Sequence, residues 1–387
     1  MSLKFRAETF GGILALDEPP MLVHVDREFM RELGVESSPL WKDAASGPLS
    51  APLEVHFSVT NSCSVRCRHC YMDSGDRDAG EMSGIEFRKA MDLLAEMGVF
   101  HIAMGGGEAL ERPDLFELAA HVRSRGMVAN LTTNGLLLTR ETATQCTIFG
   151  QVNVSVDRMD APGIDGERDP AAGLRAIELL LEAGVRTGIN CVITRQNVET
   201  VEEIVAYAAA HRLHDVEFLR FKPSGRGKLD YFRRRLTAAQ NRELFPMIGR
   251  FAERYGVPIK IDCSFVPMFC WHRPDKELME RFSVYGCEAG NVLLGIRSDG
   301  RFGGCSFLPG NGNVFDLATL WHTSESLAQL RTWGSRAPEP CRSCRYLDTC
   351  KGGCRAVAAF VTGDSDSPDP ECPFVENQEG NLALSRE

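Results

Sequence analysis

The stretch Leu53-Glu-Val-His-Phe-Ser-Val-Thr60 is followed two residues later by Cys63-Ser-Val-Arg-Cys67-Arg-His-Cys70. The first part predicts a strand, and the second places three thiols in the loop after it. Thiolates are soft ligands that select zinc or iron–sulfur clusters, and three of them can hold one cubane whose fourth iron has no protein ligand. Two simpler interpretations are a zinc site completed from elsewhere, for example by His69, and thiols that share a loop by chance.

From Leu53 onward the chain alternates predicted strands and helices. Six βα units in a row favour a parallel sheet with helices outside it, as a curved partial barrel or a doubly wound open sheet. The predicted strands are Leu53–Thr60, Val99–Met104, Val128–Thr133, Val152–Val156, Thr187–Ile193 and Val216–Phe221. The predicted helices are Ser83–Met97, Arg112–Arg125, Thr139–Phe149, Ala171–Ala183, Val198–His211 and Thr237–Tyr255.

Polar and glycine-rich segments follow the ends of several of these strands. Because parallel strands place their functional loops at the carboxyl edge of the sheet, we expect the segments to face one cavity. Each alone also fits an ordinary turn, so the prediction depends on their occurring together. The segments are Gly105-Gly106-Gly107-Glu108, Thr133-Asn134-Gly135, Ser155-Val-Asp157 and Arg220-Phe-Lys222-Pro-Ser-Gly225-Arg226-Gly227.

Beyond Pro258 the alternation stops and cysteines dominate. Gly300, within Asp299-Gly300-Arg301, predicts a hairpin turn between the first two of them. The spacing fits one zinc site, two zinc sites or two further clusters, and a small loop-rich region of this kind gains stability from its metal. The cysteines are Cys287, Cys305, Cys341, Cys344, Cys350, Cys354 and Cys372.

Length and charge narrow the class of protein. At 387 residues the chain favours two domains over one. A net charge of −10 argues against a broad nucleic-acid footprint. The N-terminus lacks the apolar core of a signal peptide, and no run approaches the ~18 apolar residues that span a bilayer. We therefore predict a cytoplasmic protein with no nucleic-acid and no membrane partner. Its fourteen cysteines are better explained by metal binding than by disulfides, and ten of them fall into the two cysteine groups.

The first fifty residues predict a β-hairpin, with strands Glu8–Leu16 and Met21–Val25, and a short helix at Arg27–Leu33. Such a hairpin must pack on another part of the chain. Ser37–Pro52 is typical of a linker. The predicted division is an N-terminal extension (1–50), a barrel core (51–260), a cysteine-rich domain (261–376) and a tail (377–387).

With both cysteine groups in view, residues 50–376 resemble the radical S-adenosylmethionine (SAM) enzymes that carry a C-terminal SPASM domain. Cys63, Cys67 and Cys70 match the three-cysteine signature of that superfamily, with His69 where an aromatic residue is usual. Gly106-Gly107-Glu108 matches its Gly-Gly-Glu motif, and the seven later cysteines match the SPASM pattern. The resemblance implies an α/β fold, a partial (β/α)6 TIM-like barrel followed by a small cysteine-rich domain.

The resemblance also implies cofactors and their sites. Cys63, Cys67 and Cys70 would bind a [4Fe–4S] cluster whose open iron chelates SAM, and an electron would cleave SAM to methionine and a 5′-deoxyadenosyl radical that abstracts hydrogen from the substrate. The implied SAM contacts are Gly106, Gly107, Glu108, Asn134, Ser155, Asp157 and Arg168.

Two auxiliary [4Fe–4S] clusters are implied as well. The outer one would be held by Cys341, Cys344, Cys350 and Cys372, and the inner one by Cys287, Cys305 and Cys354. The fourth ligand of the inner cluster stays open, between Cys270, Cys263 and none.

Three stretches resemble the peptide-maturing branch of mycofactocin and pyrroloquinoline quinone maturases: Met104–Glu108, Val192–Val198, and Arg220–Gly227 followed by Leu236–Gln240. The N-terminal segment Arg6–Ile13 resembles the opening of small peptide-recognition proteins, which add a leader peptide to a sheet edge. Only half of such a module fits before Pro52, so we expect a separate recognition protein, together with an electron donor such as flavodoxin or ferredoxin.

The leading hypothesis is a radical SAM oxidoreductase that decarboxylates or cross-links a ribosomally made peptide. The alternatives are a haem or tetrapyrrole side-chain enzyme of the same superfamily and a non-catalytic iron–sulfur electron-transfer protein. No catalytic acid or base is predicted.

Overall fold

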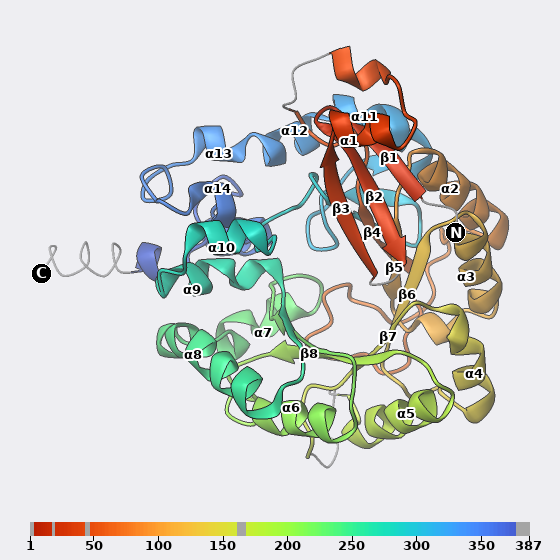
Figure 1. The fold of residues 1–387 in the computed structure, drawn as a ribbon. Helices are drawn as coiled ribbons and strands as arrows, with labels where there is room; N and C mark the ends of the chain where they lie inside the picture. The colour runs from red at the N-terminus through yellow and green to blue at the C-terminus, as the bar shows by residue number, and fades with distance from the viewer. Residues whose placement is uncertain (1–3, 18–19, 43–46, 161–167, 377–387) are drawn as a thin grey trace, which may run out of the picture.

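The computed structural model describes residues 4–17, 20–42, 47–160 and 168–376, which form two sheets with helices around the larger one (Figure 1). The predicted tail lies outside the described residues. The larger sheet has the strand order β10-β9-β8-β7-β6-β5-β4-β11-β12-β13. Six of its strands run parallel in sequence order, which confirms the partial barrel: β4 (Glu54–Thr60), β5 (His101–Gly106), β6 (Val128–Thr133), β7 (Val152–Ser155), β8 (Thr187–Ile193) and β9 (Val216–Arg220).

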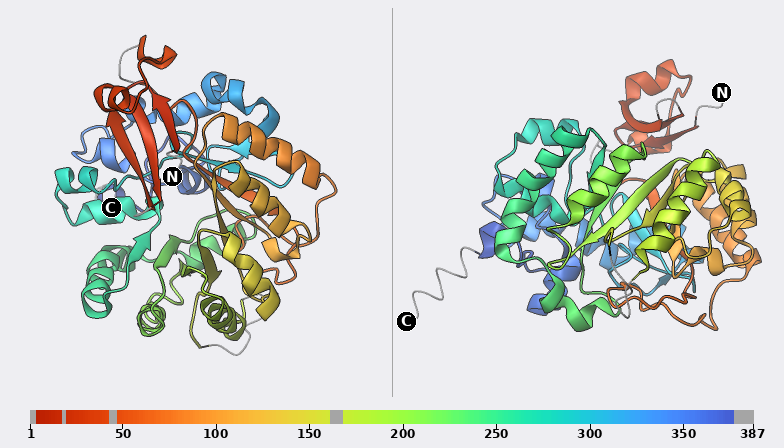
Figure 2. Two further views of the ribbon diagram at one scale, coloured as in Figure 1. Left: turned by 45° about the vertical axis from the view of Figure 1, so that its right-hand side comes forward. Right: turned by 90° about the horizontal axis from the view of Figure 1, so that it is seen from below.

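Helices cover the outside of this sheet, as both views in Figure 2 show. Their starts follow the sequence: Ser83 caps α2 and Thr237 caps α8, each in a capping box with the residue three positions on. All six predicted helices are present, Thr139–Phe149 being split into α4 and a 3₁₀ turn. They are α2 (Gly84–Glu96), α3 (Leu115–Ser124), α4 (Arg140–Gln145), α5 (Pro170–Glu182), α6 (Val201–Ala210) and α8 (Ala238–Tyr255).

The two faces of the barrel sheet differ in polarity because side chains alternate along each strand. On β4, Val55, Phe57 and Val59 are buried under the helices. The residues between them, such as Glu54 and His56, line a cavity inside the barrel. The sheet therefore encloses a polar interior instead of a packed apolar one.

The cysteine-rich region adds strands to both edges of the same sheet. β10 (Ile259–Ile261) pairs with β9, and β11 (Leu293–Ile296) pairs in parallel with β4. Gly300, at φ 83°, turns the chain into β12 (Arg301–Gly303) as predicted. The other elements of the region are β13 (Gly312–Asn313), α9 (Val266–Trp271), α10 (Lys276–Arg281), α11 (Leu317–Thr323), α12 (Glu325–Arg331), α13 (Trp333–Arg336), α14 (Leu347–Cys350) and α15 (Arg355–Thr362).

The N-terminal sheet contains the predicted hairpin, β2 (Gly11–Asp17) and β3 (Pro20–Asp26), followed by α1 (Arg27–Glu32). Sequence reasoning missed β1 (Lys4–Glu8), which pairs with β2 and leaves β3 at an edge. Arg6, 8% exposed, donates to the carbonyls of Ala51, Pro52 and Gly98, just before β4 and β5. The sheet therefore covers the N-terminal ends of the barrel strands, opposite the predicted site.

The segment expected to be a linker, residues 37–52, makes specific hydrogen bonds to other parts of the chain. Within it, Trp41 donates to the Glu8 carbonyl, the Leu49 carbonyl accepts from Trp321, and the Ser50 amide donates to Glu8. The segment thus joins the small sheet to the barrel through fixed contacts. None of the helices among the described residues has the length and apolar character needed to cross a membrane.

Candidate active site

A cavity of about 600 Å³ runs through the barrel. Glu54, His101 and Lys260 line it at the N-terminal ends of the strands, whereas Cys63 and Glu108 line it at the carboxyl ends. The cavity is therefore continuous from the side of the N-terminal sheet to the cysteine loop. The carboxyl-edge segments predicted from the sequence meet there, as expected for parallel strands.

The three thiols of the cysteine loop all line this cavity. The loop is held from several sides: the Cys63 amide donates to the Gly75 carbonyl at 2.8 Å, and Glu111 accepts from the Ser64 amide at 2.8 Å. Arg226, from the segment after β9, donates through Nε to the Cys67 carbonyl at 2.9 Å. These bonds fix the backbone of the loop, and the Ser74 amide donates to the Cys70 sulfur at 3.4 Å.

The glycine turn after β5 crosses directly over the backbone that leads into the cysteine loop. A Cβ on Gly106, at φ 120°, would lie 2.5 Å from the Thr60 carbonyl oxygen, and one on Gly107 would lie 2.0 Å from that of Ser62. Both glycines are therefore required by the loop itself. Gly105 lines the cavity, and a Cβ there would meet no atom within 4 Å.

Glu108 links the turn after β5 to the turn after β6. Its carboxylate, 1% exposed at the residue level, accepts from Thr133 Oγ1 and from the Asn134 amide, both at 2.7 Å. Burial raises the pKa of Glu108, although these hydrogen bonds oppose the shift. The carboxylate thus shapes the cavity wall at Asn134.

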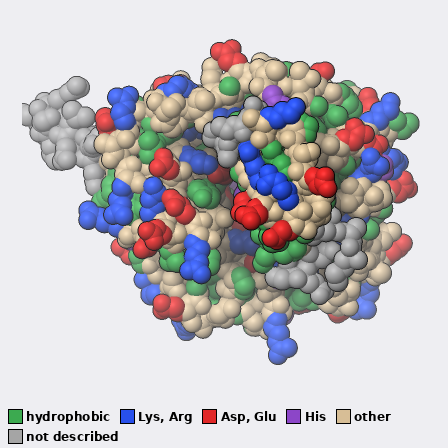
Figure 3. Space-filling view, turned by 45° about the horizontal axis from the view of Figure 1, so that its top comes forward, with side chains coloured by type: hydrophobic (Ala, Val, Ile, Leu, Met, Phe, Trp, Pro, Cys, Tyr) green, Lys and Arg blue, Asp and Glu red, His purple; other side chains and the backbone are tan. Residues whose placement is uncertain are grey.

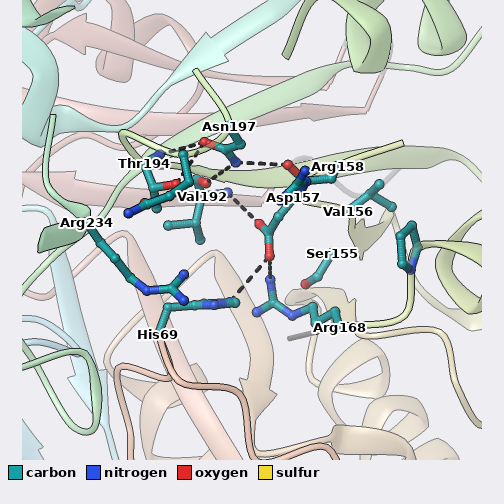
Figure 4. A pocket seen from close by; sticks show the side chains of 12 residues that line it. His69, Ser155, Val156, Asp157, Arg158, Arg168, Val192, Thr194, Asn197 and Arg234 are labelled. Carbon is teal, nitrogen blue, oxygen red and sulfur yellow. Dashed lines mark hydrogen bonds and ion pairs between the residues drawn. The ribbon is translucent and has the colours of Figure 1, made fainter. Parts of the chain in front are cut away.

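Asp157, at the end of β7, binds Arg168 and His69 beside the cavity (Figure 4). Its Oδ2 lies 2.7 Å from Arg168 and 3.3 Å from His69, and its Oδ1 accepts from the Val192 amide. Burial lowers the pKa of His69 to about 4, so the imidazole is neutral. Burial opposes ionisation of Asp157 too, but Arg168 and His69 bring its pKa below the usual value.

Arg168 reaches from this ion pair to the cysteine loop. Burial lowers its pKa, but Asp157 and the thiols of Cys67 and Cys70 outweigh burial and raise it. The guanidinium lines the same cavity as those thiols, as does Ser155. The structure therefore brings every sequence-predicted SAM contact except Asp157 to the cavity wall, and Asp157 stands behind Arg168.

Cys287, Cys305 and Cys354 line the same cavity as the first three thiols. Burial raises the pKa of Cys305 to about 12 and that of Cys354 to about 11. A buried ion pair between Lys222 and Asp262 lies beside them, and Lys222 lowers the pKa of both thiols.

Cys341, Cys344, Cys350 and Cys372 line a separate pocket, together with Cys270. Cys270, 2% exposed, forms a side-chain hydrogen bond with Cys350, which raises the pKa of the Cys350 thiol. Of the two extra thiols predicted near the inner group, only Cys263 lines the large cavity. Among the described residues no three His, Cys, Asp or Glu side chains form a group that could hold a single metal ion.

Sequence reasoning assigned no role to Arg220, Lys222 or Asp369. Arg220 is buried and bidentate with Asp369, at 2.7 and 3.0 Å, and it also binds Glu371 at 2.8 Å. The segment that holds Arg220 and Lys222 was expected to face the cavity, but their ion pairs were not predicted, because the partners lie far away in the chain.

A partial parallel barrel whose carboxyl edge carries three thiols and a glycine turn is a radical SAM architecture, and this chain belongs to the radical SAM superfamily. The superfamily's sequence profile matches residues 57–208. The chain is 31% identical over 337 residues to the mycofactocin maturase MftC of Mycobacterium tuberculosis, covering 84% of this chain and 83% of that one.

Other similar proteins include the PqqA peptide cyclase of Bradyrhizobium diazoefficiens, at 29% identity over 83% of this chain and 86% of that one. The AdoMet-dependent heme synthase of Nitratidesulfovibrio vulgaris is 28% identical over 83% and 92%. The crystal structure of Streptococcus suis SuiB bound to precursor peptide SuiA has the same fold, with a TM-score of 0.77 at 19% identity, covering 96% of this chain and 98% of that one.

The protein is accordingly a radical SAM enzyme, whose cofactors are a [4Fe–4S] cluster and SAM, with auxiliary clusters in the cysteine-rich region. The residues of the site fit such groups. The thiols are soft donors on one cavity, and Gly105 leaves open space beside them. Arg168 supplies a fixed positive charge at the same wall.

Proposed function

We propose that this enzyme modifies a ribosomally made peptide by decarboxylation or cross-linking at a side chain. The observation that carries the proposal is the cavity of about 600 Å³, whose wall reaches from the N-terminal ends of the barrel strands to the cysteine loop. A cavity that spans the depth of the sheet suits an extended chain. The relatives named as peptide maturases and cyclases support the same substrate class.

In this proposal Cys63, Cys67 and Cys70 bind the cluster whose electron cleaves SAM and generates the radical that abstracts hydrogen from the substrate. The chain's own residues position SAM and exclude water. Arg168, held by Asp157, pairs with the SAM carboxylate, and the remaining contacts come from Gly106, Gly107, Glu108, Asn134 and Ser155. Glu108 acts mainly by fixing the turn at Asn134.

We propose that the outer auxiliary cluster is held by Cys341, Cys344, Cys350 and Cys372, and the inner one by Cys287, Cys305 and Cys354. Their placement in two separate pockets supports this division. A flavodoxin or ferredoxin supplies the electron. Ten cysteines used in this way, among fourteen in the chain, suit the cytoplasm, where thiols stay reduced.

The N-terminal extension of residues 1–50 would recognise the leader of the peptide. β3 is an edge strand in the described part of its sheet, and Met21 and Leu22 on it are 45% and 39% exposed. Phe29 on α1 is 43% exposed beside it, and Figure 3 shows hydrophobic side chains mixed with charged ones on the face turned toward the viewer. A leader can extend such an edge, with the rest of the recognition surface supplied by a separate small protein.

This arrangement sets a spacing for the substrate. β4 has seven residues, so the barrel is about 23 Å deep at 3.3 Å per residue. An extended peptide would therefore need about seven residues between its leader contact at the barrel's N-terminal end and the residue that reacts at the carboxyl edge. The proposed core of residues 51–260 and the proposed cysteine-rich domain of residues 261–376 both contribute strands to the one sheet that spans this distance.

The test measures iron, sulfide and 5′-deoxyadenosine after anaerobic reconstitution with dithionite and SAM. Wild type should hold about twelve irons, and Cys63→Ala/Cys67→Ala/Cys70→Ala should lose about four together with 5′-deoxyadenosine. Cys146→Ala is the control, because Cys146 is buried in the outer core. Candidate precursor peptides and a porphyrin are then titrated. Binding and turnover of porphyrin alone would support the tetrapyrrole alternative, and bound clusters without SAM cleavage would support electron transfer.

A further inference from the structure

We propose that Cys263 is the fourth thiolate of the inner auxiliary cluster, so that no iron of that cluster is left open to substrate. This assignment deepens the proposed function and rests on it. It concerns one ligand that the seven-cysteine pattern of the C-terminal region does not contain.

The four thiols converge on one place from four separate segments. Cys263 follows β10, Cys287 precedes β11, Cys305 follows β12 and Cys354 precedes α15. All four line the same cavity. Cys287 and Cys354 both lie within electrostatic range of the Cys263 thiol.

The backbone fixes Cys263 in this position. The Asp262 amide donates to the Phe218 carbonyl, which continues the pairing of β10 with β9. The Asp262 carboxylate caps the 3₁₀ turn Cys263–Phe265 by accepting from the Ser264 amide. The thiol is therefore presented by a strand end and a capped turn, which need no rearrangement to reach the cavity.

Charge around the site suits a thiolate. Cys263 must lose its proton to bind iron, and a buried anion needs a compensating charge. Lys222, buried and paired with Asp262, lines the same cavity as the Cys263, Cys305 and Cys354 thiols. A buried cation therefore lies on the wall that carries these thiols.

Cys270, the other extra cysteine near this region, belongs elsewhere. It lines the pocket of the outer group and contacts Cys350. With four thiolates on the inner cluster, substrate has no iron to bind there. The inner cluster then passes electrons, and the peptide is held by the cavity wall alone.

The experiment uses the Cys63→Ala/Cys67→Ala/Cys70→Ala chain, in which only the auxiliary clusters remain. The inner cluster's electron paramagnetic resonance signal is identified as the one lost in Cys305→Ala. The probe is ¹³C-cyanide, added to the reduced protein and detected by its hyperfine coupling to iron. We expect about eight irons and no coupling in this background.

Adding Cys263→Ala should create ¹³C coupling on the inner cluster or remove about four irons with the outer signal retained. Cys263→Ser should keep the cluster with a shifted inner signal, because a serine oxygen replaces sulfur. Cys270→Ala is the matched control and should leave the inner signal unchanged.

Cyanide coupling in the background that retains Cys263, or an inner signal unchanged by Cys263→Ala and Cys263→Ser, would overturn the assignment. Fewer than about eight irons with no inner signal would overturn both this assignment and the cluster content proposed above. Peptide turnover is not part of the readout, so a wrong substrate class would leave the result for Cys263 intact.

Discussion

Replacing Arg220 by methionine should destabilise the enzyme by breaking the ion pair that joins β9 to the C-terminal region. The side chain of Arg220 is 3% exposed, and those of Asp369 and Glu371 are 0% and 4% exposed. Arg220→Met leaves Asp369 buried without its cation, whereas Glu371 keeps Arg235 at 3.2 Å, and breaking a buried pair in this way typically costs about 3–5 kcal/mol. For cooperative unfolding of 387 residues at about 2.1 cal/mol/K per residue, this lowers Tm by about 4–6 °C.

The assay is anaerobic thermal unfolding of the cluster-loaded protein, followed by circular dichroism. Arg301→Ala is the matched control, because Arg301 is 58% exposed and its pair with Asp299 contributes only about 0–1 kcal/mol. Adding Asp369→Asn to Arg220→Met should recover part of the loss, since the buried carboxylate left without its cation is then neutral. A Tm for Arg220→Met no lower than that of the control would refute the reasoning.

Three further changes test the site. Asp157→Asn removes the charged partner of Arg168, and hydrogen bonds to charged groups contribute about 1.5–3 kcal/mol. The affinity for SAM, measured by equilibrium dialysis, should therefore fall about 10- to 150-fold with iron content unchanged. An unchanged affinity would contradict the proposed role of Arg168 in binding SAM. Gly107→Ala would place a Cβ 2.0 Å from a carbonyl oxygen of the cysteine-loop lead-in, so analysis should find about four irons missing. Burial lowers the pKa of His56, but Glu54 more than offsets burial, so the pKa is raised in the folded protein. The stabilisation that protonated His56 gains from Glu54 is therefore complete below about pH 6.5 and is lost as pH rises through the raised pKa of the folded state. The pKa of Glu54 is lowered despite burial, so the stabilisation from its ionised carboxylate is present above about pH 4.5. The difference in Tm between wild type and Glu54→Gln should therefore be widest from about pH 4.5 to 6.5. A difference in Tm that does not change with pH would contradict this prediction.

Sequence periodicity predicted the barrel well because each βα unit is a local pattern with its own capping signals. Strand Thr187–Ile193 was predicted with the bounds that the structure has, and α8 begins one residue after its predicted start. β1 was missed because Lys4–Glu8 is too short and polar to register as a strand alone. Its place in the sheet comes from pairing with β2 and from Arg6, whose partners lie some forty-five to ninety residues away.

The site was predictable as a set of residue types, but not as a set of contacts. The cysteine spacing indicated metal binding, yet whether Cys263 or Cys270 lies near the inner group depends on how β10 and α9 pack. The reason for the glycines at Gly106 and Gly107 was also incomplete. They were expected only as SAM contacts, whereas the structure shows a backbone crossing that leaves no room for a Cβ.

The segment 220–226 after β9 explains why one stretch of sequence matters for the whole site. Arg220 at its start binds Asp369, which also accepts from the Cys354 amide. Arg226 at its end donates to the Cys67 carbonyl, and between them Ser224 donates to the Tyr71 carbonyl. One seven-residue segment therefore contacts both the cysteine loop and the C-terminal cysteine region.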